Sequence, residues 1–188
     1  MTSDTLIDPE LRGDRYLYHS TQLDNIHSIL RHGIQPSTDG HRDGLEDDLV
    51  TIADKHGFDL PISRQDCVFF YVFPDQATRL TSFKSDDTDM HGLNRADGLV
   101  VIDGSQISGD MYVGEFQLIS DAIDHQYMSE PDDVMISESY NEALRLYAES
   151  LTRIESFSEL GQVCAPFHLP EVVVENGVAP TVIVDSVT

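Results

Sequence analysis

The segment from Tyr16 to Pro36 constrains the fold more than any other part of the chain, because it reads as a strand, a turn and a helix in direct succession. Its first residues, Tyr16 to Tyr18, are aromatic and apolar, as residues of short strands often are. His19 follows at the predicted end of this strand. Side chains in such places are held by a regular element yet face the loops that commonly carry function. The pattern therefore marks His19 as the first candidate functional residue.

A helix is predicted directly after this strand. Thr21 and Asp24 have the spacing of a capping box, which favours a helix start. The apolar residues that follow fall on one helical face, namely Leu23, Ile26, Ile29 and Leu30. Gly33 followed by the apolar Ile34 is typical of a helix C-terminus, so the helix is expected to end near His32.

Length and composition predict one domain over residues 1–188. A chain of 188 residues with 40% hydrophobic residues can bury one core. No apolar run approaches the length of a membrane span, and the N-terminus lacks the regions of a signal peptide, so we expect a cytoplasmic protein without membrane contact. Cys67 and Cys164 each lie among apolar residues and are expected to be buried thiols.

An excess of acidic residues is the strongest feature of the composition. Asp and Glu number 34 against 11 Lys and Arg, which gives a formal net charge of −23. Such a charge repels itself at low ionic strength, and molar salt screens it to a distance of about 3 Å. We therefore expect a halophilic protein from a salt-rich cytoplasm. The same charge argues against a broad basic surface for nucleic-acid phosphates, although a local arginine-lined groove is compatible with it.

The remaining apolar segments complete an α+β pattern. Strands are predicted at residues 67–72, 97–103, 111–119 and 172–174, and helical segments at residues 45–53, 75–80 and 139–154. The last of these is expected to begin at a capping box formed by Ser139 and Glu142. Asn176-Gly177 is a tight-turn signal. Residues 82–96 are polar and weakly patterned, as lids often are, and residues before Arg12 are expected to form an arm.

Three of these segments resemble the motifs of one enzyme family. The string LYHSTQLDNIHSILRHGIQPS, which starts at Leu17, is similar to the opening strand and helix of the ADP-ribosyltransferase superfamily. FYVFPDQA, which starts at Phe70, resembles the second motif of that superfamily, and PEVVVENGVAPTVI, which starts at Pro170, resembles its late glutamate segment. The resemblance implies an α+β fold of split, mostly antiparallel β-sheets with flanking helices. It also implies NAD as co-substrate.

The resemblance further implies which residues form the site. His19, in the motif His19-Ser20-Thr21, would hydrogen-bond a ribose hydroxyl, and Ser20 and Thr21 would join it in binding the cofactor. Tyr71 would stack on nicotinamide, and Glu171 would stabilise the cation that forms when the nicotinamide–ribose bond breaks. A neutral imidazole both donates and accepts, a phenol ring offers a flat face, and a carboxylate stabilises developing positive charge, so these residue types suit the chemistry.

Alternatives exist for several of these positions. Phe70 competes with Tyr71 for the stacking role, and Glu115 has a similar context to Glu171 but lacks the closing Val-x-Pro-x-x-Ile pattern, so Glu171 is preferred. Related proteins often carry an arginine for phosphate or ribose contacts at the position of Arg64. Arg64, Arg12 or Arg15 would meet the pyrophosphate, because a guanidinium forks onto phosphate oxygens.

Other chemistries lack motifs in this sequence. His-Glu-x-x-His, Cys-x-x-Cys, Gly-x-Ser-x-Gly and glycine-rich dinucleotide patterns do not occur, so no metal site, hydrolase or Rossmann fold is predicted. The function expected from the resemblance is NAD-dependent ADP-ribosyl transfer to a nucleic acid or protein acceptor. An NAD-dependent RNA 2′-phosphotransferase-like enzyme is one alternative, although Arg64 lacks the following His-x-His of that branch. A catalytically inactive binding module is the other.

Overall fold

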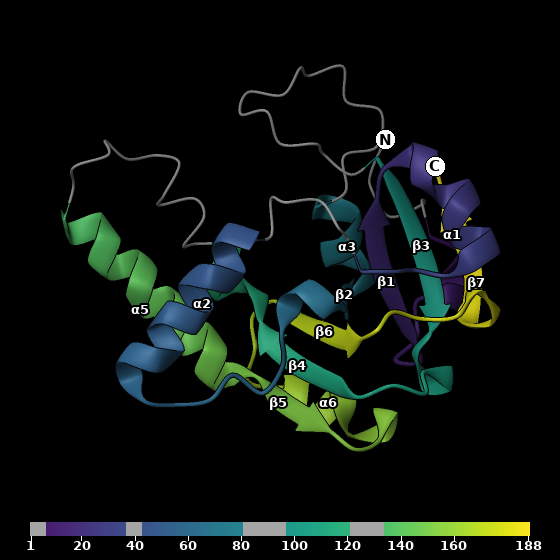
Figure 1. The fold of residues 1–188 in the computed structure, drawn as a ribbon. Helices are drawn as coiled ribbons and strands as arrows, with labels where there is room; N and C mark the ends of the chain where they lie inside the picture. The colour runs from purple at the N-terminus through teal and green to yellow at the C-terminus, as the bar shows by residue number, and fades with distance from the viewer. Residues whose placement is uncertain (1–6, 37–42, 81–96, 121–133) are drawn as a thin grey trace.

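A seven-stranded antiparallel sheet organises the chain, which a computed structural model describes over residues 7–36, 43–80, 97–120 and 134–188 (Figure 1). The strand order is β5-β4-β6-β2-β1-β3-β7. The strands are β1 (Tyr16–Thr21), β2 (Cys67–Tyr71), β3 (Gly98–Asp103), β4 (Met111–Glu115), β5 (Thr152–Ile154), β6 (Pro170–Glu175) and β7 (Ile183–Val187). The helices are α1 (Ile26–His32), α2 (Asp43–His56), α3 (Pro74–Leu80), α5 (Val134–Ser150) and α6 (Leu160–Cys164). The predicted α+β class is thereby confirmed.

The sheet consists of two well-paired halves that meet along a narrow seam. Six residue pairs join β1 to β3, and five join β2 to β6. Between β1 and β2, by contrast, Tyr18 opposite Tyr71 is the one register pair. The expected split sheets are therefore found as a single sheet, with the first half formed by β1, β3 and β7 and the second by β5, β4, β6 and β2.

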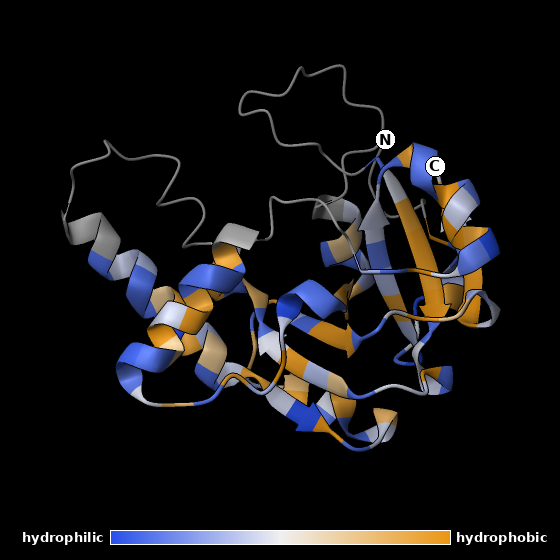
Figure 2. Cartoon of the chain, viewed as in Figure 1, coloured by the Kyte–Doolittle hydropathy of each residue, from blue (hydrophilic) through white to orange (hydrophobic). Residues whose placement is uncertain are grey.

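Helices cover both faces of the sheet, as the separate core clusters indicate. On one face, α1 and α6 pack with Leu17, Phe70 and Val172 in the largest cluster. On the other face, Ala77 of α3 packs against Tyr18 of β1, and α2 and α5 pack together beside β4 (Figure 1). Apolar residues follow the strands and the inner sides of these helices (Figure 2). Within the described ranges, no helix has the length and apolar character that a bilayer crossing requires.

The first predicted helix begins later than expected. Thr21 is the last residue of β1, residues 23–25 form a 3₁₀ turn, and α1 starts at Ile26. The first turn is capped from far along the chain, because the Asp97 carboxylate accepts a hydrogen bond from the backbone N–H of Leu23 at 2.6 Å. Of the predicted apolar face, Ile26 and Ile29 are buried, whereas Leu23 and Leu30 are exposed.

The predicted end of that helix is confirmed. Gly33 has a φ of +82°, and an added Cβ would lie 2.1 Å from the carbonyl oxygen of Val178. Ile34 then pairs with Val178 in an isolated bridge. Asn176 and Gly177 have φ values of +61° and +83°, as the tight-turn signal predicted. The two turns therefore lock the end of α1 against the chain that follows β6.

Three other predictions need correction. The strand from Met111 ends at Glu115, and residues 116–120 are helical. The long helix begins at Val134 rather than at the Ser139 box, and it ends at Ser150, so Ile154 belongs to β5 instead of the helical stripe. The N-terminal segment is no arm from residue 7 onward, because Ile7 is fully buried and its carbonyl accepts a bond from Arg12. The predicted lid at residues 82–96 lies outside the described residues.

Candidate functional site

A row of paired residues crosses the centre of the sheet. Tyr18 of β1 lies opposite Tyr71 of β2, Tyr71 lies opposite Glu171 of β6, and Glu171 lies opposite Gly114 of β4. Directly opposed residues in antiparallel strands point to the same face. Two sequence-predicted site residues, Tyr71 and Glu171, are thus neighbours on one face of the sheet.

Glu171 is buried in a polar cluster. Its Oε1 atom accepts a hydrogen bond from Arg64 Nη1 at 2.7 Å and another from the Tyr147 hydroxyl at 2.6 Å. Arg64 Nη1 also donates to the Tyr147 hydroxyl. A buried carboxylate is costly unless it is paired and hydrogen-bonded, and this one has both a cation and a hydroxyl donor. The three side chains come from β6, the turn before β2, and α5.

Arg64 is fixed from several sides. It opens a 3₁₀ turn at residues 64–66 directly before β2. Its guanidinium carbon lies 4.0 Å from the centroid of the Phe69 ring, which is a cation–π arrangement. Its backbone N–H donates to the buried Glu46 carboxylate of α2 at 3.0 Å. Arg64 is therefore built into the site rather than exposed on the surface.

Tyr71 shares this face with Glu171 and Ser20. Its side chain has a hydrogen bond with Ser20, and its ring meets Phe116 edge-on at a centroid distance of 6.3 Å. Burial is the main cause that raises the pKa of Tyr71, and the nearby negative charge of Glu171 raises it further. The phenol therefore stays neutral beside the carboxylate and retains a hydroxyl that can donate or accept.

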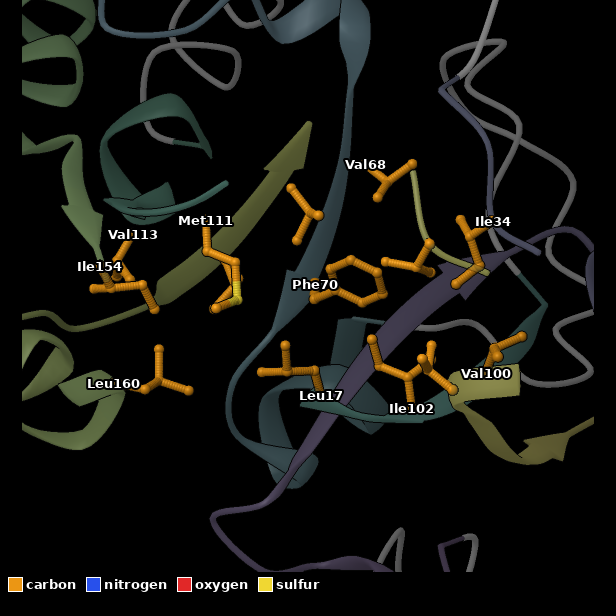
Figure 3. Packing of buried hydrophobic residues seen from close by; sticks show 14 of the residues in the cluster. Leu17, Ile34, Val68, Phe70, Val100, Ile102, Met111, Val113, Ile154 and Leu160 are labelled. Atoms are coloured by element: carbon orange, nitrogen blue, oxygen red, sulfur yellow. The ribbon is translucent and has the colours of Figure 1, made fainter. Parts of the chain in front are cut away.

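Phe70 belongs to the opposite face. It is 1% exposed and points among Leu17, Ile34 and Met111 in the main core (Figure 3). Neighbouring residues of a strand face opposite ways, which separates Phe70 from Tyr71. Of the two aromatic candidates, Tyr71 is thus the one beside Glu171.

His19 also lies on the face of Phe70. Its ring centroid is 5.7 Å from that of Phe70, and its Nδ1 atom is 2.9 Å from the carbonyl oxygen of Phe69. Because a carbonyl oxygen only accepts, Nδ1 carries the proton, and Nε2 is the acceptor of the neutral ring. His19 thus bridges the seam between β1 and β2, but the structure does not bring it onto the face of Glu171. Thr21, on the same strand, is buried.

Glu115 has a different environment from Glu171. Its two carboxylate oxygens accept from backbone N–H groups just before β6, from Leu169 at 2.8 Å and His168 at 2.5 Å. A third, longer bond comes from the N–H of Gln117 at 3.3 Å. These contacts fix the chain at the entry to β6, as a helix or turn cap does.

The remaining arginine candidates, Arg12 and Arg15, each form an ion pair with a carboxylate other than Glu171. Arg15 Nε donates to the buried Asp103 carboxylate at 2.9 Å, and this contact holds the pKa of Asp103 well below its usual range. Arg12 Nη1 lies 3.2 Å from Asp75 on α3.

Within the described ranges, no group of three His, Cys, Asp or Glu side chains is placed to hold a metal ion. The two cysteines are buried, and burial raises the pKa of each thiol to about 12.

Two residues that hydrogen-bond Arg64, Tyr147 and Glu46, escaped the sequence analysis. Tyr147 reads as one residue of an apolar helical stripe, and Glu46 as one of many acidic residues on a helix. The signal that marks Tyr147 is Gly114, since a glycine within a strand often allows a close approach by another group. Comparisons with family models, with curated proteins and with solved structures found no match to this chain.

Proposed function

We propose that this chain is an NAD-dependent ADP-ribosyltransferase that cleaves the nicotinamide–ribose bond and passes ADP-ribose to a nucleic acid or protein acceptor. One observation carries the proposal. Tyr71 and Glu171, which resemble the stacking and catalytic residues of that superfamily, lie opposite each other on adjacent strands, with Arg64 bonded to Glu171. The two motifs are 100 residues apart in the sequence, so their meeting at one place is independent of the resemblance that selected them.

The reaction assigns each group a task. The bond between the ribose carbon and the nicotinamide nitrogen breaks, its electron pair goes to the ring nitrogen, and positive charge develops on the ribose. The Glu171 carboxylate stabilises that charge, which is the electrostatic kind of catalysis that acts most strongly where water is excluded. An acceptor oxygen or nitrogen then bonds to the ribose carbon and gives its proton to solvent water. Tyr71 offers its ring to nicotinamide, which holds the leaving group in place.

The proposed place for NAD is the face of the sheet that carries Tyr71 and Glu171, beside the seam between β1 and β2. His19 and Glu171 lie on opposite faces of the sheet, so NAD bound beside Tyr71 and Glu171 does not contact His19 in this arrangement. Ser20, next to His19, hydrogen-bonds Tyr71 across this seam. The Arg64 guanidinium has further N–H donors besides Nη1, and a phosphate oxygen of NAD can share them.

The net charge of −23 bears on the acceptor and on the conditions of any assay. A polyanionic acceptor would have to overcome the repulsion of this charge, which falls as salt is added. We propose a halophilic, cytoplasmic enzyme, and its assays belong in molar KCl.

Calorimetry with NAD and chromatography of released nicotinamide test the proposal directly. The wild type is expected to bind NAD and to release nicotinamide. Glu171→Gln preserves side-chain size and most hydrogen bonds, so it should still bind NAD while release falls by about 10²-fold to 10³-fold. If the wild type binds no NAD in molar KCl, the proposal is wrong and the chain is better explained as an inactive binding module.

A further inference from the structure

We propose that Tyr147 is a positioning residue, which holds the carboxylate of Glu171 in the orientation that ADP-ribosyl transfer requires. This inference rests on the function proposed above. The Tyr147 hydroxyl donates to Glu171 Oε1 at 2.6 Å, and Tyr147 itself is fully buried. The same hydroxyl accepts from Arg64 Nη1. It therefore connects the carboxylate and the cation that balances its charge.

The sheet leaves a place for this ring. Gly114 lies opposite Glu171, and a Cβ added to it would lie 2.9 Å from Tyr147 Cε2 and 3.1 Å from Leu151 Cδ2. Real side chains do not approach that closely in a packed interior, because interiors are already at crystal-like density. The absence of a side chain at residue 114 thus lets the Tyr147 ring lie across β4 and reach the neighbouring strand.

Packing around the Tyr147 ring restrains the position of its hydroxyl. Tyr147 packs with Leu49 and Ile52 of α2 and with Leu144 of its own helix. A tyrosine has only two side-chain torsions, and both are restrained when the ring is packed on all sides. With Arg64 alone, the Glu171 carboxylate could turn about a single contact. With Tyr147 as well, Oε1 is held from two directions.

A purely structural role is the competing interpretation, since Tyr147 also fills a hydrophobic cluster. The two interpretations differ in what the hydroxyl does. If Tyr147 only packs, Tyr147→Phe should leave catalysis unchanged. If it positions Glu171, removal of the hydroxyl should slow turnover and change its pH dependence, because a donor to an ionised carboxylate favours the charged form. Titratable groups near Glu171 include Arg64 and Tyr71, and Glu46 accepts a hydrogen bond from the backbone of Arg64.

The test compares two tyrosine-to-phenylalanine changes on the same helix. Tyr140 lies two turns before Tyr147, and its hydroxyl donates to Asp48 of α2 at 2.6 Å, which makes Tyr140→Phe a matched control. In molar KCl, Tyr147→Phe is expected to lower kcat by about tenfold to hundredfold, the usual effect of one hydrogen bond to a charged group, with little change in KM for NAD. The acidic limb of its rate–pH profile should move to higher pH. Tyr140→Phe should change neither.

A second variant displaces the ring without removing its hydroxyl. Gly114→Ala keeps the hydroxyl but displaces the ring, so it should lower kcat in the same direction as Tyr147→Phe. Equal kcat values and pH profiles for Tyr147→Phe and Tyr140→Phe, in an active wild type, would overturn the positioning role and leave the proposed function intact. A wild type that binds no NAD would instead refute the proposed function, and the positioning role with it.

Discussion

The end of β4 and the start of β6 each carry a buried glutamate, and the two carboxylates differ in the groups that donate hydrogen bonds to them. Glu115 lies opposite Pro170, and the next pair along is Gly114 with Glu171, so the two glutamates point to opposite faces. Backbone N–H groups of His168 and Leu169 satisfy Glu115. Side chains of Arg64 and Tyr147, from two other elements, satisfy Glu171.

The difference indicates which carboxylate is suited to chemistry. Bonds from backbone N–H groups tie Glu115 to the path of the chain, so it cannot exchange partners without moving the start of β6. Side-chain partners leave the backbone path free, and Arg64 has N–H groups besides Nη1 that the proposal assigns to a ligand. The proposed function therefore assigns the chemistry to the carboxylate held by side chains, whereas the one held by the backbone supports the fold.

The largest effect on stability is expected when the cation beside Glu171 is removed. Arg64→Met keeps an apolar stem but leaves a buried carboxylate without its positive partner. Breaking a buried ion pair in this way typically destabilises a protein by about 3–5 kcal/mol. Urea unfolding of wild type and variant in the same buffer measures the difference. A change below about 1 kcal/mol would mean that Glu171 is more hydrated than the described cluster implies.

A smaller loss is expected at the other glutamate. Glu115→Gln replaces one carboxylate oxygen by an NH₂ group, which cannot accept from the N–H of His168 or Leu169. One buried backbone donor is then left without a partner, at a cost of about 1–3 kcal/mol. Thermal and urea unfolding give the value. Stability equal to that of the wild type would contradict the capping role of Glu115.

The pKa of Tyr71 reports on the distance between its phenol and Glu171. The carboxylate is the second cause of the raised pKa of Tyr71, after burial. A negative charge disfavours the phenolate, so Glu171→Gln should lower the pKa of Tyr71 while burial keeps it above the ordinary value. Titration followed by NMR of ¹³C-labelled tyrosine rings detects the change. Glu115→Gln serves as the control, because it removes a charge on the opposite face of the sheet. A Tyr71 pKa that is the same in Glu171→Gln and in the wild type would show that the Glu171 carboxylate does not lie beside the Tyr71 phenol.

The smallest effect on stability per carboxylate is expected at the surface, where the interaction of each exposed charge contributes about 0–1 kcal/mol to the free energy of unfolding. The formal net charge is −23, so many small repulsions add up. Added KCl screens these repulsions but hardly reaches the buried pair of Arg64 and Glu171. The melting temperature of the wild type should therefore rise as KCl is raised into the molar range. A melting temperature that is flat from low to molar KCl would remove the argument for salt adaptation.

Local patterns in the sequence predicted the parts of the fold that local chemistry determines. The end of α1 at Gly33 and the turn at Asn176-Gly177 were predictable because both need a positive φ. The start of α1 was not, since Thr21 stays in β1 opposite Gly98 and the cap comes from Asp97, which is 74 residues from Leu23. Tertiary pairing therefore overrode a local helix signal.

The candidate site shows the same division. The motifs around Tyr71 and Glu171 predicted two residues that the structure places opposite each other. The face of His19 was not predictable, because strand register decides it and a shift by one residue would reverse it. Tyr147 was also missed, since it is 83 residues from Arg64 and 24 from Glu171, and its helical stripe is satisfied by core packing alone.

A paired measurement on Glu171→Gln and Glu115→Gln tests the central claim most directly. Nicotinamide release and the free energy of unfolding would be measured for both variants and the wild type in molar KCl, with NAD binding confirmed by calorimetry. We predict that Glu171→Gln loses about 10²-fold to 10³-fold in release while it still binds NAD, and that Glu115→Gln loses stability but retains release within about tenfold of the wild type. Loss of release in Glu115→Gln alone, with Glu171→Gln fully active, would contradict the assignment of the catalytic carboxylate.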